Sequence, residues 1–431
     1  MLRRHRILAA VLAALALPAA QGAAASAAPP PQGMGWTVID RYGGDANGDG
    51  RIDAPTPLRP EGINTFPVRV LPSAAVCEEL DRATWRVDGE PADAVPEAGE
   101  HCGAVVEVHG EGEHLVKVLA RNRAEVARVT VDDKLIVAVG DSVASGEGNP
   151  VDAKARWLDE GCHRSAAAGF EQAARLLGEV DRRRSITFVN LACSGAEIEE
   201  GLLGSYDGVG SGGGKPYAPQ VDRLHRIAEI RGRRKGEPEV DAVLVSVGAN
   251  DLRFSEVVLQ CANLGDCRKP AKGPLDARLK ALGPRYDDLG EALAEEVPGA
   301  PVLISEYFDP THDEAGDFCK DGPGLAGESE VKWAYKQVLR RLNEEVRTAA
   351  HRNHWQYLDE IASDFSHHGY CVRKSKRWVR TFPEAVHMKN ALGTLHPNED
   401  GHRAIARRVA GPLAELLDFR TPAPPPSAES D

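Results

Sequence analysis

Aromatic residues are scarce in this sequence of 431 residues, where Phe, Trp and Tyr together make up 5%. So few rings give no obvious platform on which a substrate could stack. Positive charge is also in deficit, because 52 Lys and Arg face 65 Asp and Glu, a net charge of −13. Such a chain repels polyphosphate, so we expect no nucleic-acid partner. Beyond the N-terminal region no apolar run is long enough to span a bilayer.

A long apolar run occupies residues 7–17, after the basic Arg3, Arg4 and Arg6 and before an Ala-rich stretch with Ala-x-Ala cleavage options. This order is typical of a secretory signal peptide, which we place at residues 1–28. We therefore expect a secreted, extracellular protein. The Pro-rich residues 420–431 are predicted to form a disordered tail.

Eight cysteines lack the paired C-x-x-C spacing of a zinc site. In an exported chain they predict four disulfides. Cys77 and Cys102 both precede the apolar strand expected at residues 135–139 and are expected to pair with each other. Cys261 and Cys267 are close enough to join one loop.

Residues 34–131 contain short alternating stretches separated by Gly, Pro and acidic turns, which predicts a small β-sandwich with Trp85 in its core. The expected strands cover residues 68–71, 84–87, 104–108 and 114–118. The segment loosely resembles the immunoglobulin-like modules of the polycystic-kidney-disease (PKD) type that precede catalytic domains in secreted actinobacterial enzymes.

Within that segment, oxygen-bearing groups recur at the spacing of a calcium loop, with Gly50 at the tight turn. The candidate ligands are Asp45, Asn47, Asp49, Asp53 and the carbonyl of Arg51. Thr56 stands where the loop normally has a bidentate Glu. The stretch therefore predicts either a structural calcium site or an Asx-rich turn that binds no metal.

Residues 132–419 alternate buried strands with amphipathic helices, the pattern of a parallel sheet with helices on both faces. The clearest helix spans residues 331–346. Strands are expected at residues 135–139, 186–191, 242–247, 301–305 and 355–358. The predicted fold class is α/β, a three-layer α/β/α domain behind the sandwich.

Four short motifs follow three of these strands or precede the last helix: Gly140-Asp141-Ser142, Gly195, Gly248-x-Asn250-Asp251 and His396-Pro397. Each alone could be a helix cap, a turn or a surface residue. Together, in this order, they resemble the four blocks of the SGNH, or GDSL, hydrolases, whose domain is flavodoxin-like.

The resemblance implies that Ser142 is the nucleophile, that Gly195 and Asn250 stabilise the oxyanion with the Ser142 N–H, and that His396 is the base. The chemistry needs these residue types. A serine hydroxyl must lose its proton to a nearby imidazole during attack. The oxyanion needs preorganised N–H donors, and Gly195 has no side chain that could block access to its main-chain N–H group.

The segments around Ser142, Cys162 and Cys193 also resemble the secreted Streptomyces esterase and lipase branch of that family. The resemblance implies disulfides Cys162–Cys193, Cys261–Cys267 and Cys319–Cys371, and catalysis without a metal cofactor. It further implies hydrolysis of carboxylic esters, including acylglycerols.

The group that orients the base is an open point. Gly393 occupies the position, three residues before His396, where most of the family has an aspartate. The branch resemblance suggests a Ser142–His396 dyad oriented by the Gly393 main-chain carbonyl. The alternative is a carboxylate from elsewhere, with four candidates: Asp251, Asp359, Asp364 and Asp400.

The sequence thus predicts a secreted serine esterase or lipase, acting as a monomer on small-molecule or lipid esters. Two alternatives remain open. One is O-deacetylation of a polysaccharide held by the sandwich, and the other is a binding protein that has lost activity.

Overall fold

The structure is a computed structural model. It describes residues 34–44, 51–52, 61–97, 102–121, 123–151, 156–180, 184–209, 216–232, 238–264, 266–320 and 327–419. The predicted signal peptide, the predicted tail and all of the predicted calcium ligands except Arg51 lie outside these residues. No helix within these ranges is both long and apolar enough to cross a membrane.

The N-terminal part forms two antiparallel four-stranded sheets. One has the order β1 (Gly35–Val38), β5 (Thr65–Leu71), β9 (Ala104–His109), β8 (Ala94–Pro96). The other has the order β11 (Arg123–Val131), β10 (Gly112–Ala120), β6 (Thr84–Val87), β7 (Glu90–Ala92). Buried and exposed residues alternate along β10 and β11, and the inward side chains pack around Trp85. All four strands expected from the sequence are present, whereas the PKD-type assignment stays a prediction.

The second part is built on a parallel six-stranded sheet. Its order is β16 (Gln356–Leu358), β15 (Val302–Ser305), β14 (Ala242–Ser246), β12 (Asp133–Gly140), β13 (Ser185–Asn190), β2 (Arg41–Gly44). Every residue of β13 and β14 is buried, because helices cover both faces. The next two strands in the chain lie on opposite sides of β12, with β13 on one side and β14 on the other. Ligands of open α/β sheets bind where the strand order switches sides in this way.

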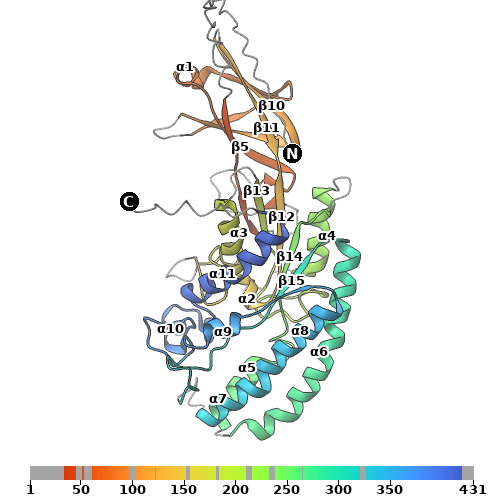
Figure 1. Cartoon of the computed structure of the whole chain (residues 1–431), viewed down its shortest axis with the longest axis vertical. Helices are drawn as coiled ribbons and strands as arrows, with labels where there is room; N and C mark the ends of the chain where they lie inside the picture. Colours follow the sequence, from red (N-terminus) through yellow and green to blue (C-terminus); the bar gives the residue numbers. More distant parts are fainter. Residues whose placement is uncertain are drawn as a thin grey trace, which may run out of the picture. The chain divides into compact units, whose positions relative to one another are not determined.

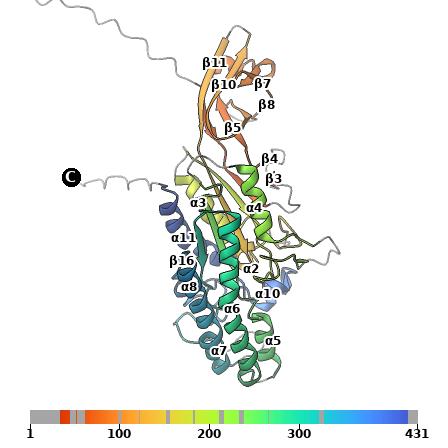
Figure 2. The ribbon, with the colours of Figure 1, turned by 90° about the vertical axis from the view of Figure 1, so that its right-hand side faces the viewer.

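Helices α3 (Gly169–Val180) and α11 (Glu399–Leu416) pack together on one face of the sheet (Figure 1). On the other face α6 (Arg268–Glu296) lies against both α4 (Gln220–Arg231) and α8 (Arg340–Arg352) (Figure 2). The α/β/α architecture is therefore as predicted.

The helix predicted at residues 331–346 is part of a longer one. Helix α7 (Glu328–Ala334) runs through a π-helical segment, Tyr335–Leu339, into α8. Helix α6 lies between two of the predicted strands and continues through Pro274 and Pro284, although proline normally interrupts a helix.

Strand β2 departs from the predicted boundary between residues 131 and 132. It precedes most of the sandwich in the chain, yet it pairs in parallel with β13. Arg41 is almost fully buried and donates to the Thr187 hydroxyl of β13 and to the carbonyls of Ile63 and Thr65. These bonds satisfy the guanidinium inside the protein, which allows a strand that begins with arginine to complete the sheet.

Candidate active site

Ser142 follows β12 and is the first residue of the short helix α2 (Ser142–Ser145). The Asp141 carboxylate caps this helix by accepting the Val143 N–H at 3.0 Å. Main-chain bonds hold the neighbouring strand ends against it: the Cys193 N–H donates to the Gly140 carbonyl at 3.0 Å, and the Asp141 N–H to the Ser246 carbonyl at 2.8 Å. The loops after β12, β13 and β14 therefore meet at one edge of the sheet.

His396 lies on the loop between a short 3-10 helix, η4 (Ala391–Gly393), and α11. Its Nε2 is 2.7 Å from the Ser142 hydroxyl oxygen. Its Nδ1 is 3.2 Å from the Thr394 carbonyl oxygen. A carbonyl can only accept, so Nδ1 carries the proton and Nε2 presents a lone pair to the serine hydroxyl.

The acceptor for Nδ1 corrects one prediction, since it is Thr394 and not Gly393. The Gly393 carbonyl is already engaged, because it accepts the main-chain N–H of His396 at 3.1 Å. Position 393 is closely packed. A Cβ there would lie 2.7 Å from the Asn390 Nδ2 and 3.2 Å from the Gly148 Cα. An aspartate at this position would therefore displace Asn390 from the Glu147 carboxylate to which it donates.

The four carboxylates considered as alternatives are not bonded to the imidazole. Asp251 accepts the Ile198 N–H and pairs with Arg285 at 3.0 Å. Asp364 and Asp400 pair with Arg408 and Arg403, respectively. For Asp359 no hydrogen bond to His396 is present among the described residues.

Burial lowers the pKa of His396 below its usual 6.5, and the nearby Glu147 carboxylate acts in the opposite direction. An imidazole with a lowered pKa is neutral at physiological pH, which is the state that can accept a proton from Ser142.

Gly195 has a φ of +85°, in the left-handed region. A Cβ at this position would lie 2.2 Å from the Tyr206 hydroxyl oxygen, so no larger residue fits. The segment is also anchored by the Cys162–Cys193 disulfide. Within the described part of the chain, the N–H groups of Ser142 and Gly195 have no hydrogen-bond acceptor. Both remain available to a developing oxyanion.

Asn250 follows β14, and its amide Nδ2 donates to the Ala196 carbonyl at 3.0 Å. The amide nitrogen carries two hydrogens, so this bond orients the side chain and leaves one donor. The structure thus brings all four sequence-predicted residues to one edge of the sheet.

Tyr307, which the sequence did not single out, connects two of these loops. Its hydroxyl donates to the Asp141 carboxylate at 2.5 Å and accepts the Ala249 N–H at 3.0 Å. Burial raises the pKa of Asp141 to about 7, and the Tyr307 hydrogen bond counteracts part of this shift. Tyr307 lies just after β15. Its position after a buried strand is the sequence feature from which its place at the site could have been predicted.

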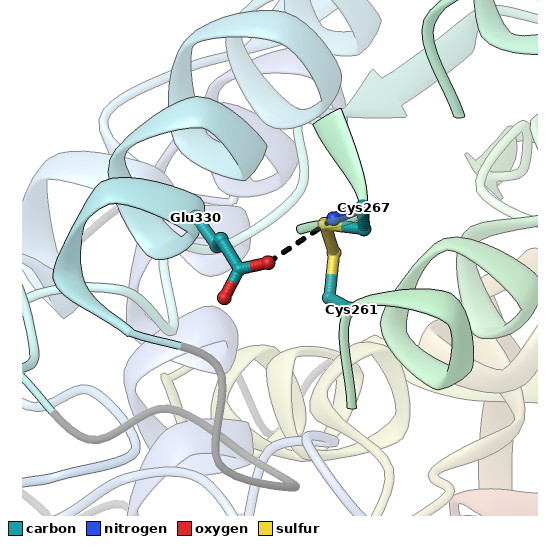
Figure 3. A group of neighbouring side chains, drawn as sticks. All are labelled: Cys261, Cys267 and Glu330. Carbon is teal, nitrogen blue, oxygen red and sulfur yellow. Dashed lines mark hydrogen bonds between the residues drawn. A yellow bond between two sulfur atoms is a disulfide. The ribbon is translucent and has the colours of Figure 1, made fainter. Parts of the chain in front are cut away.

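All four disulfides pair as predicted: Cys77–Cys102, Cys162–Cys193, Cys261–Cys267 and Cys319–Cys371. Within the described ranges, one group of side chains has the proximity of a metal site, namely Cys261, Cys267 and Glu330 (Figure 3). Both thiols are consumed in the disulfide and cannot ligate as thiolates. Glu330 accepts the Cys267 and Gly327 N–H groups instead, which joins α7 to the disulfide loop.

An apolar pocket lies beside this disulfide, between α5 (Phe254–Leu264), α7 and the His396 loop. Two of its lining residues are close in the chain to site residues. Leu395 directly precedes His396, and Phe254 lies four residues after Asn250. The remaining wall includes Val257, Val258, Val331, Ala334 and Tyr370.

A model of the GDSL-like lipase/acylhydrolase family matches residues 138–404, which is more than half of the chain. The chain belongs to this family. It is therefore a hydrolase that acts on ester bonds, and its match begins in β12 and ends in α11.

Several solved structures are similar to the chain at low sequence identity. An extracellular lipase from Streptomyces rimosus is 19% identical, covers 65% of this chain and 99% of its own, and gives a TM-score of 0.47. A phospholipase A1 from Streptomyces albidoflavus NA297 is 19% identical, with coverage of 68% and 100% and a TM-score of 0.42. A carbohydrate esterase family 2 enzyme from Corynascus thermopiles is 13% identical, with coverage of 89% and 100% and a TM-score of 0.40. No curated protein matches the chain.

Proposed function

We propose that the protein is a secreted serine carboxylic-ester hydrolase, an esterase or lipase that forms an acyl-enzyme on Ser142 with His396 as the base. The observation that carries this proposal is the 2.7 Å hydrogen bond between the Ser142 hydroxyl and the His396 Nε2, made by an imidazole whose Nδ1 proton is fixed by a carbonyl.

Hydrolysis would proceed in two acyl-transfer steps. The Ser142 oxygen attacks the ester carbonyl carbon while Nε2 of His396 takes the hydroxyl proton. The oxyanion accepts hydrogen bonds from the Ser142 and Gly195 N–H groups and the Asn250 amide. The imidazolium then protonates the departing alcohol. Water attacks the acyl-enzyme in the same way, losing its proton to Nε2, and the acid leaves as Ser142 regains its proton.

The apolar pocket beside Leu395 is the proposed site for the acyl chain. Its wall is apolar, and each methylene transferred from water to such a site contributes about 0.8 kcal/mol. A pocket that begins next to the catalytic base suits an acyl group whose carbonyl carbon lies at Ser142.

Secretion is part of the proposal, supported by the predicted signal peptide and the four disulfides, which persist in oxidising compartments. Triacylglycerols and related lipid esters are the proposed natural substrates.

The proposal is tested with p-nitrophenyl esters of increasing acyl length, compared with acetylated xylan. We expect kcat/KM to rise by about tenfold or more between acetate and octanoate, because the longer chain fills the apolar pocket. Acetate release from xylan that exceeds hydrolysis of every p-nitrophenyl ester would instead support a polysaccharide deacetylase. No hydrolysis of either substrate class by folded protein would contradict the catalytic proposal.

Filling the pocket should change the chain-length preference. Ala334→Trp places an indole into the lining, so kcat/KM for the octanoate ester should fall about tenfold while the acetate ester is hydrolysed as before. Ser329→Trp is the matched control, because Ser329 lies on α7 but is exposed. Equal losses on both esters in Ala334→Trp would indicate that the acyl chain binds elsewhere.

A further inference from the structure

Glu147 lies five residues after Ser142 and has none of its surface exposed. The carboxylate is surrounded by donors. Oε1 accepts from the Asn390 amide at 2.7 Å, and Oε2 accepts from the Ser194 hydroxyl and the His163 Nδ1, each at 2.8 Å. A carboxylate removed from water is costly unless such donors replace the solvent.

The donors come from the loops that carry the other site residues. Ser194 immediately precedes Gly195, and Asn390 begins the turn that leads through η4 to His396. Glu147 itself is bonded to the nucleophile's own turn, because its N–H donates to the Ser142 carbonyl at 2.9 Å. Glu147 therefore contacts the nucleophile's turn through its main chain, and the loops of the oxyanion donor and the base through its side chain.

Glu147 is also the negative charge that His396 experiences. Hydrogen bonds from His163 and Asn390 and the nearby imidazole of His396 hold the pKa of Glu147 below its usual range, against the effect of burial. The carboxylate in turn raises the pKa of His396. His163 also acts on the His396 imidazole, and Arg380 acts on the neighbouring His402. The acids Glu384, Glu399 and Asp400 act on Arg380, and among the acids Glu147 is the one with the largest effect on His396. His402 is buried with its pKa lowered to about 4, so it is neutral.

We propose that Glu147 is a positioning residue that links the three catalytic loops and supplies the negative charge that stabilises the His396 imidazolium. In the usual triad a carboxylate on Nδ1 has both tasks. Here they are divided: the Thr394 carbonyl fixes the tautomer, and Glu147 provides the charge with no hydrogen bond to the ring in the described structure. This inference rests on the proposed role of His396 as the base.

The test is Glu147→Gln, read as the pH profile of kcat/KM on a soluble ester. The amide has nearly the shape of the carboxylate and can be accommodated, since Oδ1 of Asn390 is buried without a hydrogen bond in the described structure and an amide flip would present it. Loss of the charge should lower the pKa of His396, so the acid limb should move to lower pH by about one unit. At the optimum, kcat should fall about tenfold or more, because the imidazolium formed in the transition state is less stabilised.

The matched control is Glu171→Gln. Glu171 is equally buried, but its carboxylate pairs with Arg175 at 2.6 Å on α3, away from the catalytic loops. Its replacement should leave the acid limb in place. A merely structural role for Glu147 would lower the melting temperature and kcat without moving the limb, and that result would overturn the charge assignment.

If Glu147→Gln does not fold, Asn390→Ala takes its place. It removes one donor from Glu147 and leaves the charge, so kcat should fall while the acid limb stays within about 0.3 units. Wild-type kcat in that variant would contradict the positioning role. Failure of the inference is distinct from failure of the proposed function: an inactive His396→Ala beside a wild-type-like Glu147→Gln rejects only the role of Glu147.

Discussion

Ser142→Ala is expected to lower kcat on a soluble p-nitrophenyl ester by about 10⁴-fold or more, with the protein still folded. The reason is that no other hydroxyl in the described structure is bonded to the His396 imidazole, so the acyl-enzyme cannot form. Ser142 is partly exposed at the end of β12, and removal of its oxygen leaves no cavity in the core. The measurement is steady-state turnover, together with a thermal melt that shows an unchanged fold.

His396→Ala should produce a loss of the same size, because a neutral serine hydroxyl is a weak nucleophile without its base. The double variant Ser142→Ala/His396→Ala serves as the control. Residues that act as one unit are not additive, so the double variant should be no slower than either single variant. Retention of more than about a tenth of wild-type turnover in either single variant would reject the dyad.

Asn250→Ala is expected to reduce kcat by about 10²- to 10³-fold with little change in KM, because it removes one donor to the oxyanion. The substrate carbonyl carries its full negative charge only after attack, so the loss falls on the transition state. Kinetics on the same soluble ester measure both parameters.

Asn250 also bonds to the Ala196 carbonyl, and its loss could act through the neighbouring loop. Tyr206→Phe controls for this effect. It removes the hydroxyl that donates to the Ser194 carbonyl at 3.1 Å, but no proposed oxyanion donor. A loss in Tyr206→Phe as large as that in Asn250→Ala would show that loop position, and not the amide donor, accounts for the result.

The roles of the catalytic residues came from the resemblance of their motifs to the SGNH hydrolases, and their common location was predictable because each follows a buried strand or precedes a helix. Leu135 to Val139 form an uninterrupted apolar run, and the residues directly after such a run in a parallel sheet lie at its ligand-binding edge. Position along the chain therefore specifies position in space for Ser142, Gly195 and Asn250.

The hydrogen-bond acceptor of His396 was predicted as a main-chain carbonyl but assigned one residue too early. Which carbonyl of a turn faces a side chain depends on local dihedral angles. Here the Gly393 carbonyl closes the turn by accepting a main-chain N–H, a detail that residue types alone do not encode.

Glu147 escaped prediction for a different reason. A single glutamate among small residues, with Gly146 before it and Gly148 after it, is typical of a solvent-exposed turn. Its three donors, His163, Ser194 and Asn390, come from segments distant in the chain, so only the fold reveals that this carboxylate is buried.

The placement of β2 affects how the protein can fold. Arg41 is made early in synthesis, yet its partner in the sheet, Thr187, is 146 residues further along. Joining segments so far apart requires closure of a long loop, which slows folding. Strands β1 and β5 flank β2 in the chain and can join the sandwich as soon as β9 to β11 exist, which leaves β2 unpaired between them. We expect the pairing of β2 with β13 to be the last step in forming the parallel sheet. One of the first strands to be synthesised would then be among the last to pair.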